Sequence, residues 1–336
     1  MKKFLSLLLV FVFCLSFTAC GNVNNESSIA EKTEKLDINC NVFALKGPTG
    51  VGMVSLMEKN ANGKANLNYK FNLVGANEEI VAKITNGEAD IAAVATNVAS
   101  TLYNKTKGTE KQISVLAINT LGVLCIVSKG EEIATVADLK GKTIYSTGQG
   151  ANPEFIINYI LEKNNLKVGK DVKVEYVSEP TELVSKVITN EKAVVVAPQP
   201  VATNITIKDK SAKIVLDLND EWDKISETKL VMGAIVVRNK YLSENPKAVE
   251  TFLKDYEASI NDVNADVVTA ASLCEKYEIV SPAAVAQKAI PYCNIVYQDG
   301  KELKTNLSAY LKFLFDNKPA IIGNNLPADD FYYETN

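Results

Sequence analysis

The sequence contains no histidine, and Arg238 is its only arginine. Without histidine the chain lacks Ser–His and His–Cys nucleophile pairs and the usual ligands of a catalytic zinc. With a single guanidinium it has little means of clamping a phosphate through bidentate arginine contacts. It also has no C-x-x-C pair for redox chemistry and no D-x-D-x-D-G loop for calcium. These absences predict a protein that is not an enzyme and that holds no metal and no cofactor.

Basic clusters are also missing. The formal net charge is −4 over 336 residues, and this balance argues against nucleic acid as a partner. Cys40 and Cys125 lie in apolar runs and are predicted to be buried thiols. The state of Cys274 and Cys293 remains open, because their spacing fits both two free thiols and an extracellular disulfide.

The N-terminus has the pattern of a secretory signal peptide. Lys2 and Lys3 precede the apolar run "FLSLLLVFVF", and "SFTAC" ends at Cys20. This ending resembles a bacterial lipobox, so we expect residues 1–19 to be removed and Cys20 to be lipidated. An ordinary signal peptide with an incidental cysteine is the alternative. Residues 20–35 are polar and are predicted to be a flexible tether to the outer face of the bacterial cell membrane.

The rest of the chain alternates apolar runs with amphipathic stretches. Strands are predicted over 36–45, 68–75, 89–96, 113–120 and 122–130, and again between 139 and 237. Helices are predicted over 77–87 and over 152–166, the latter with Asn152 as its N-cap. Beyond Pro246 the sequence reads as mostly helical. This alternation predicts an α/β fold with mostly parallel sheets flanked by helices.

Two segments follow the same plan. "KITNGEADIAAVATNVA" (83–99) and "KVITNEKAVVVAPQPVA" (186–202) each run from a helix through an apolar strand to a polar loop and the next helix. Their likeness predicts two lobes, with the chain crossing between them near 122–126 and 231–237. We expect residues 36–123 and 236–336 to form lobe 1 and residues 124–235 to form lobe 2.

The stretch "LKGPTGVGMVSL" (45–56) nearly matches the phosphate-binding P-loop, but Met53 and Val54 replace its lysine and hydroxyl residue. Nucleotide binding is therefore rejected. A glycine-rich loop between a strand and a helix still directs backbone N–H groups toward a ligand. The alternative is an ordinary strand–helix turn. The candidate ligand-binding residues in this loop are Lys46, Gly47, Pro48, Thr49 and Gly50.

In α/β sheets, ligands bind at the carboxyl ends of the strands, and this strand-end rule selects further positions. The loop "STGQGANPE" (146–154) offers a second glycine-rich turn, although Glu154 is expected to occupy part of that helix terminus itself. Adjacent carboxylates such as Glu78 and Glu79 are predicted to be solvated surface, and Trp222 and Tyr103 to be packed in the core. The remaining ligand-binding candidates follow predicted strands: Thr96, Asn97, Ser100, Asn119, Thr120, Thr147, Gly148, Gln149, Gly150, Pro198 and Gln199.

The motifs and their order resemble the extracytoplasmic substrate-binding proteins of ABC transporters, in the branch for nitrate, sulfonate, taurine and thiamine-pyrimidine precursors. The resemblance rests on the lipobox, "ALKGPTGVGM", "NGEADIAAVATNVAS", "VADLKGKTIYSTGQGANPEFIINYIL" and "YLSENPKAVETFL". It implies a type II periplasmic-binding-protein-like fold, in which a monomer captures a small polar or anionic solute between two hinged lobes.

The implied partner is an ABC permease in the membrane, to which the receptor delivers its solute. Two alternatives remain at this stage. One is an enzyme on the same scaffold that acts on a pyrimidine-type precursor, and the missing acid–base and nucleophile pairs argue against it. The other is a lipoprotein that senses its ligand without transporting it.

Overall fold

The structure, a computed structural model, describes residues 35–334. The predicted signal peptide, Cys20 and the tether up to residue 34 lie outside the described residues. Within this range no helix has the length and apolarity needed to cross a membrane. The α-helices are α1 (Pro48–Val51), α2 (Val54–Ala61), α3 (Asn77–Thr85), α4 (Thr96–Thr106), α5 (Asn152–Lys163), α6 (Pro180–Thr189), α7 (Val201–Lys208), α8 (Leu218–Asp223), α9 (Asn239–Glu244), α10 (Pro246–Ala265), α11 (Val267–Lys276), α12 (Ala283–Ala289) and α13 (Gly300–Asn317).

Six strands form the first sheet. They are β1 (Asn39–Leu45), β2 (Asn68–Val74), β3 (Ile91–Ala95), β4 (Ile113–Thr120), β10 (Gly233–Arg238) and β11 (Ile295–Gln298). Their spatial order is β11-β4-β10-β3-β1-β2. The first three strands pair in parallel, whereas β10 runs antiparallel to both β3 and β4. The carboxyl ends of β1 to β4 therefore meet at one edge of the sheet.

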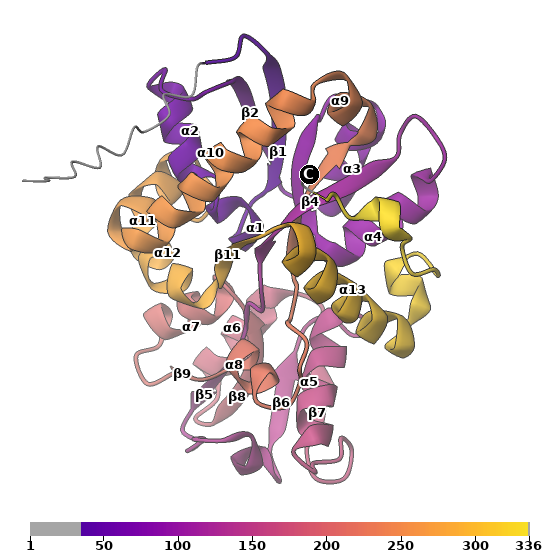
Figure 1. Cartoon of the computed structure of the whole chain (residues 1–336). Coiled ribbons are helices and arrows are strands. Elements are labelled where there is room, and N and C mark those ends of the chain that lie inside the picture. The colour runs from indigo at the N-terminus through magenta and orange to yellow at the C-terminus, as the bar shows by residue number, and fades with distance from the viewer. Residues whose placement is uncertain (1–34, 335–336) are drawn as a thin grey trace, which may run out of the picture. The chain divides into compact units, whose positions relative to one another are not determined.

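Five strands form the second sheet. They are β5 (Leu124–Lys129), β6 (Thr143–Ser146), β7 (Lys173–Tyr176), β8 (Ala193–Pro198) and β9 (Lys213–Asp217), in the order β7-β6-β8-β5-β9. Here β6 is parallel to β7 and β8, and β5 is antiparallel to β8 and β9. The predicted α/β class with two helix-flanked sheets is confirmed (Figure 1).

Alternation along the strands divides the first sheet between two hydrophobic cores. In β3, Ile91 and Ala93 face a core built with α2, α10, α11 and α12. Ala92 and Val94 face the opposite core, built with α3, α4 and α13. Both sides of the strand are fully buried, which explains its continuous apolar sequence. Figure 1 shows the two helix groups on opposite sides of this sheet.

The chain passes from the first sheet to the second through residues 121–123 and returns through residues 224–232. Gly122 is held from both sides, because its N–H donates to Asn219 Oδ1 and its carbonyl accepts from Asn294 Nδ2. A Cβ at this position would lie 2.8 Å from Asn219 Cβ, so only glycine fits the crossing. The boundary expected between residues 235 and 236 falls inside β10, which pairs with the first sheet from Gly233 onward.

Three local predictions need correction or completion. The strand β11 was missed, because four residues within a mostly helical region carry too weak an alternation signal. Helix α5 begins at Asn152, one residue earlier than expected, so Ala151 is its N-cap and Asn152 makes no capping bond. The sequence leaves open whether Cys274 and Cys293 form a disulfide; in the structure both are buried free thiols.

Other core predictions are confirmed. Cys40 and Cys125 are buried free thiols, and burial raises the pKa of each to about 12. Trp222 and Tyr103 are fully buried. The indole of Trp222 packs at a tilt against the ring of Tyr159 and edge to face against Phe313, at 4.8 and 4.9 Å between centroids. Neither Trp222 nor Tyr103 is therefore placed to stack on a ligand.

Asp217 ends β9 and accepts a hydrogen bond from the N–H of Asn219, and burial raises its pKa to about 6. The folded state holds this proton more tightly than the unfolded state, so stability decreases as the pH rises from about 4 to about 6. We expect Asp217→Asn, which retains the helix cap, to raise the free energy of unfolding by about 1–2 kcal/mol at neutral pH, after allowance for partial exposure.

Urea unfolding at several pH values measures this effect. The two proteins should be equally stable near pH 4 and diverge above it. An Asp217→Asn variant that is equally stable or less stable at neutral pH would contradict the assignment.

Candidate ligand-binding site

A cavity of about 420 Å³ lies where several strands of both sheets end. We call this cavity the cleft. The carboxyl ends of β1 to β4 and of β8 reach it, together with the two crossing segments. In open α/β sheets, ligands bind at such strand ends. The lining residues are Leu45, Lys46, Pro48, Thr49, Gly75, Ala76, Asn77, Glu78, Ala95, Thr120, Val123, Pro198, Gln199 and Met232.

Six of the residues predicted from sequence line the cleft. Lys46, Pro48 and Thr49 come from the loop after β1, and Thr120 ends β4. Pro198 and Gln199 come from the end of β8 in the second sheet. The Gln199 side chain is buried and already engaged, since its Oε1 accepts from the Thr203 hydroxyl at 2.8 Å. It therefore shapes the wall more than it offers a hydrogen-bonding group.

Gly50 and Gly52 of the opening loop are required for close packing within the protein. A Cβ on Gly50 would lie 2.6 Å from the Leu45 carbonyl oxygen, and one on Gly52 would lie 2.8 Å from the Tyr256 hydroxyl. Gly47 has φ +101°, a conformation that favours glycine. The N–H groups of Gly47 and Gly50 are already bonded, to the carbonyls of Ile279 and Gly47. Gly47 and Gly50 do not line the cleft.

Asn119 is a supporting residue beneath the cleft. It is 1 % exposed, and its Nδ2 donates to both the Thr49 carbonyl and the Tyr256 hydroxyl at 2.9 Å. Burial raises the pKa of Tyr256, so this hydroxyl stays protonated. The Thr120 hydroxyl donates to Asn119 Oδ1 at 3.2 Å. Asn119 therefore fixes the position of Thr49 and does not line the cleft.

The two predicted hydroxyls of α4 also point inward. The Thr96 hydroxyl donates to the Val231 carbonyl at 2.6 Å, and the Ser100 hydroxyl donates to the Ile322 carbonyl at 2.9 Å. Both side chains are fully buried. Asn97, next to Thr96, lines a separate smaller cavity between α3 and α4.

The second glycine-rich loop contributes no residue to the lining of the cleft. None of Thr147, Gly148, Gln149 and Gly150 lines it. The Gly150 N–H donates to the Glu154 carboxylate, as the sequence predicts for an acid in the first turn. The Gly150 carbonyl accepts from Lys318 Nζ at 3.1 Å, which links this loop to the end of α13.

Sequence reasoning missed the segment after β2. Gly75, Ala76, Asn77 and Glu78 all line the cleft, and Glu78 is an exposed residue at its rim rather than remote surface. These residues directly follow β2, which ends at Val74, so the strand-end rule also points to them. Leu45, Ala95, Val123 and Met232 carry no polar signal, so only the fold reveals them.

The cleft carries little charge. Its cation is Lys46, whose Nζ lies 3.4 Å from Glu278 in an exposed ion pair, and its anion is Glu78. Arg238 does not contribute, because it bonds to Asp90 and the Ala89 carbonyl at the opposite end of β3. Within residues 35–334 no group of three or more acidic or cysteine side chains is placed to hold a metal ion.

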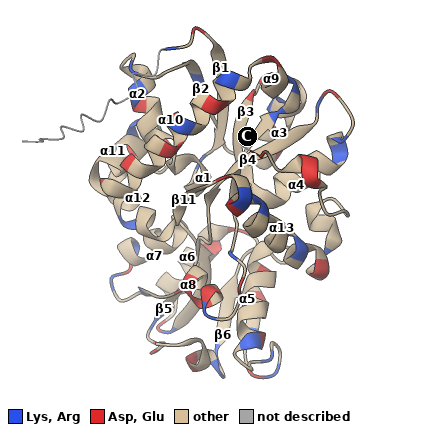
Figure 2. Cartoon of the chain, viewed as in Figure 1, with Lys and Arg blue, Asp and Glu red and all other residues tan. Residues whose placement is uncertain are grey.

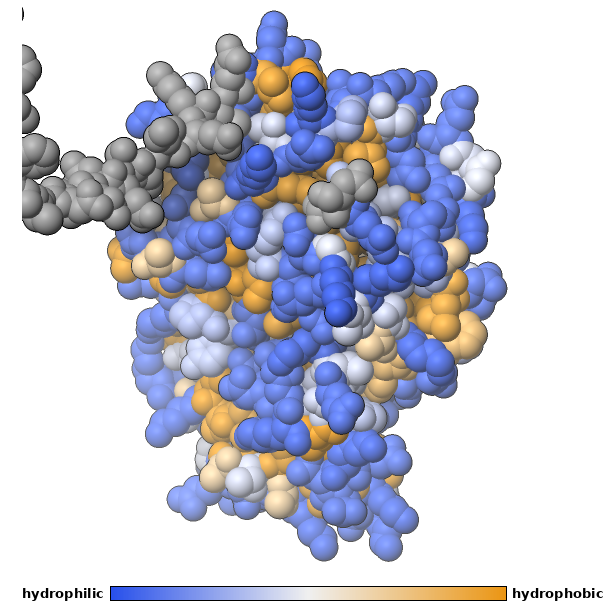
Figure 3. All heavy atoms as spheres, viewed as in Figure 1, coloured by the Kyte–Doolittle hydropathy of each residue, from blue (hydrophilic) through white to orange (hydrophobic). Residues whose placement is uncertain are grey.

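The visible surface shows neither a large patch of charge of one sign nor a broad apolar area. Figure 2 shows lysine and acidic residues interspersed over the helices. Figure 3 shows hydrophobic residues in small separate groups on the same side. On this side no patch of charge or hydrophobic residues competes with the cleft as a candidate site.

Solved structures share this fold at low sequence identity. An ABC transporter protein from Parabacteroides distasonis is 22% identical, with a TM-score of 0.75, over 89% of this chain and 100% of that one. The periplasmic aliphatic sulphonate binding protein SsuA from Escherichia coli is 13% identical, with a TM-score of 0.65, over 89% and 94%. The periplasmic nitrate-binding protein NrtA from Synechocystis PCC 6803 is 14% identical, with a TM-score of 0.57, over 89% and 85%.

The fold and the cleft thus define a periplasmic-binding-protein-like receptor. Residues 64–283 match the family described as "ABC transporter, phosphonate, periplasmic substrate-binding protein", and the chain belongs to this family. It is the periplasmic substrate-binding component of an ABC importer. No curated protein matches the chain.

Proposed function

We propose that the chain is a lipid-anchored, monomeric receptor that captures a small polar or anionic organic solute in the cleft and presents it to an ABC permease. We further propose that the two sheets are the cores of two lobes, hinged at residues 121–123 and 224–232. Because β10 pairs with the first sheet along its whole length, we set the second boundary between residues 232 and 233. The observation that carries the proposal is the cleft at the strand ends of both sheets.

The polar groups around the cleft define the expected head of the solute. Lys46 supplies one positive charge and Glu78 one negative charge, while Thr49 and Asn77 supply neutral hydrogen-bonding groups. Lys46 can leave Glu278 at little cost, since exposed ion pairs contribute at most about 1 kcal/mol. A dianionic phosphonate would be poorly neutralised by one lysine. We therefore propose a head that is neutral, zwitterionic or singly negative.

Mass spectrometry of solute released from the denatured protein identifies the ligand, and titration calorimetry then tests the cleft. For a negatively charged head, we expect Lys46→Met to weaken binding about ten- to a hundredfold, the loss of one charge-assisted hydrogen bond. Lys170→Met, at an exposed lysine that does not line the cleft, is the control. Equal affinities of the wild type and Lys46→Met for a negatively charged solute would remove Lys46 from the site.

The anchor is tested separately. We expect Cys20→Ser to release the protein from membranes into the soluble fraction, because the lipobox cysteine is the proposed acylation site. Cys14→Ser, in the same N-terminal segment, should remain membrane-bound. Membrane fractionation followed by immunoblotting gives the answer, and unchanged association of Cys20→Ser would refute lipid anchoring at this residue.

A further inference from the structure

A second cavity adjoins the cleft between α3 and α4. We call it the side groove; its volume is about 230 Å³. Asn77 and Glu78 line both cavities, so the groove opens from the rim of the cleft. Its other lining residues are Val81 on α3 and Asn97, Val98, Thr101, Leu102 and Lys105 on α4.

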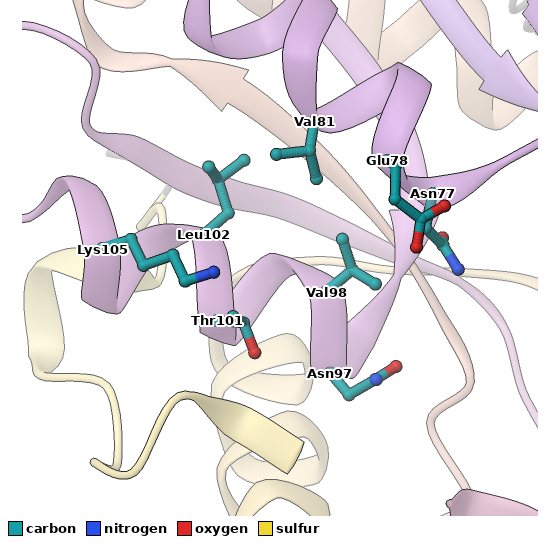
Figure 4. A pocket seen from close by; sticks show the side chains of 8 residues that line it. All are labelled: Asn77, Glu78, Val81, Asn97, Val98, Thr101, Leu102 and Lys105. Carbon is teal, nitrogen blue, oxygen red and sulfur yellow. The ribbon is translucent and has the colours of Figure 1, made fainter. Parts of the chain in front are cut away.

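The interior of the side groove is aliphatic. Figure 4 shows Val81, Val98 and Leu102 facing the same space from the two helices, with Asn77 and Glu78 toward one end and Lys105 toward the other. Leu102 is 2 % exposed, and Val81 packs against the core beneath it. Val98, by contrast, is half-buried and belongs to none of the three hydrophobic clusters formed by the described residues. Its methyl groups therefore face the groove without core partners.

We propose that the side groove binds the aliphatic part of the solute whose polar head lies in the cleft. This inference rests on the proposed function and names its substrate class: an organic molecule with a low-charge head and an alkyl tail. The shared rim at Asn77 and Glu78 allows one small molecule to occupy both cavities. From Asn97 to Lys105, α4 spans about 12 Å, which is long enough for a chain of several methylene groups.

Three homologous series test the proposal by calorimetry: n-alkyl sulfonates, n-alkyl phosphonates and neutral n-alkyl amides, each from one to eight carbons. For the series whose head fits, we expect affinity to rise about fourfold per methylene until the groove is full. This factor corresponds to the roughly 0.8 kcal/mol gained per buried methylene.

Two substitutions locate the effect. Val98→Asn makes the groove wall polar and should flatten the dependence on chain length, while Val98→Phe should fill the groove and end the rise at a shorter chain. Val268→Asn, at a valine that is 59 % exposed on α11, is the matched control and should retain the wild-type slope. Melting temperatures establish that each variant is folded.

The outcomes distinguish a failure of the side groove from a failure of the proposed solute class. Binding that is independent of chain length, or a slope retained in both Val98 variants, would overturn the side groove and leave solute binding by the cleft intact. The absence of binding in all three series would count against both the groove and the proposed solute class.

Discussion

Replacing Asp90 with alanine is expected to lower the free energy of unfolding by about 3–5 kcal/mol, as for other buried ion pairs that lose one partner. Asp90 is 7 % exposed at the start of β3. Its Oδ1 accepts from the Arg238 guanidinium at 2.7 Å, and its Oδ2 accepts from the N–H and side-chain amide of Asn41 at 2.9 Å. Removal of the carboxylate leaves the half-buried guanidinium with the Ala89 carbonyl as its remaining acceptor, and it leaves the N–H of Asn41 without its acceptor.

Chemical denaturation measures this loss, with Asp223→Ala as control. Asp223 pairs with Lys229 at 2.6 Å, but both side chains are more than a third exposed, so the cost should stay below about 1 kcal/mol. Because this site lies at the end of β3 opposite the cleft, solute affinity of the folded Asp90→Ala protein should be unchanged. A loss no larger than that of the control would show that the pair contributes little.

Gly50→Val is expected to destabilise the protein by about 3 kcal/mol or more. The new Cβ would lie 2.6 Å from the Leu45 carbonyl oxygen and 3.2 Å from Ile279 Cγ2. The nearer atom belongs to the backbone of β1 and cannot rotate away, so the loop itself must shift. Urea unfolding gives the change in stability, and calorimetry on the folded fraction reports whether the shift also disturbs Thr49 at the cleft.

Gly75→Ala is the matched control for this substitution. Gly75 lines the cleft, no atom lies within 4 Å of the position that a Cβ would take there, and its φ is not positive. Its stability should change by less than about 0.5 kcal/mol. A Gly50→Val protein as stable as Gly75→Ala would mean that the glycine at position 50 is not required for packing.

The opening loop shows which features the glycine spacing predicts and which it does not. The spacing of Gly47 and Gly52 indicated a strand–helix turn, and the turn is present. The same spacing also indicated N–H groups directed at a ligand, but those of Gly47 and Gly50 bond to carbonyls within the protein. The Gly47 N–H bonds to the carbonyl of Ile279, which is more than two hundred residues away in the sequence. No local pattern can therefore indicate the direction of this N–H group.

The strand-end rule had a similar limit. It identified Thr120 and Gln199, which line the cleft, because every parallel strand ends at the same sheet edge. It also selected Thr96 and Asn119, whose side chains turn inward to bond Val231 and Thr49. A strand position predicts proximity to the edge, but the partner across the core decides which way the side chain points.

The sequence by itself determined most of the helices and strands, the class of fold and the exclusion of histidine-based and arginine-based chemistry. These follow from local periodicity and composition, because burial on both faces makes β3 and β8 apolar throughout. Only the tertiary structure decided that Arg238 pairs with Asp90, that Gly50 and Gly52 pack against the β1 backbone and α10, and that α3 and α4 leave an aliphatic groove beside the cleft. The physical reason is that hydrogen-bond partners and cavities arise between segments distant in sequence, where no local pattern records which groups will meet.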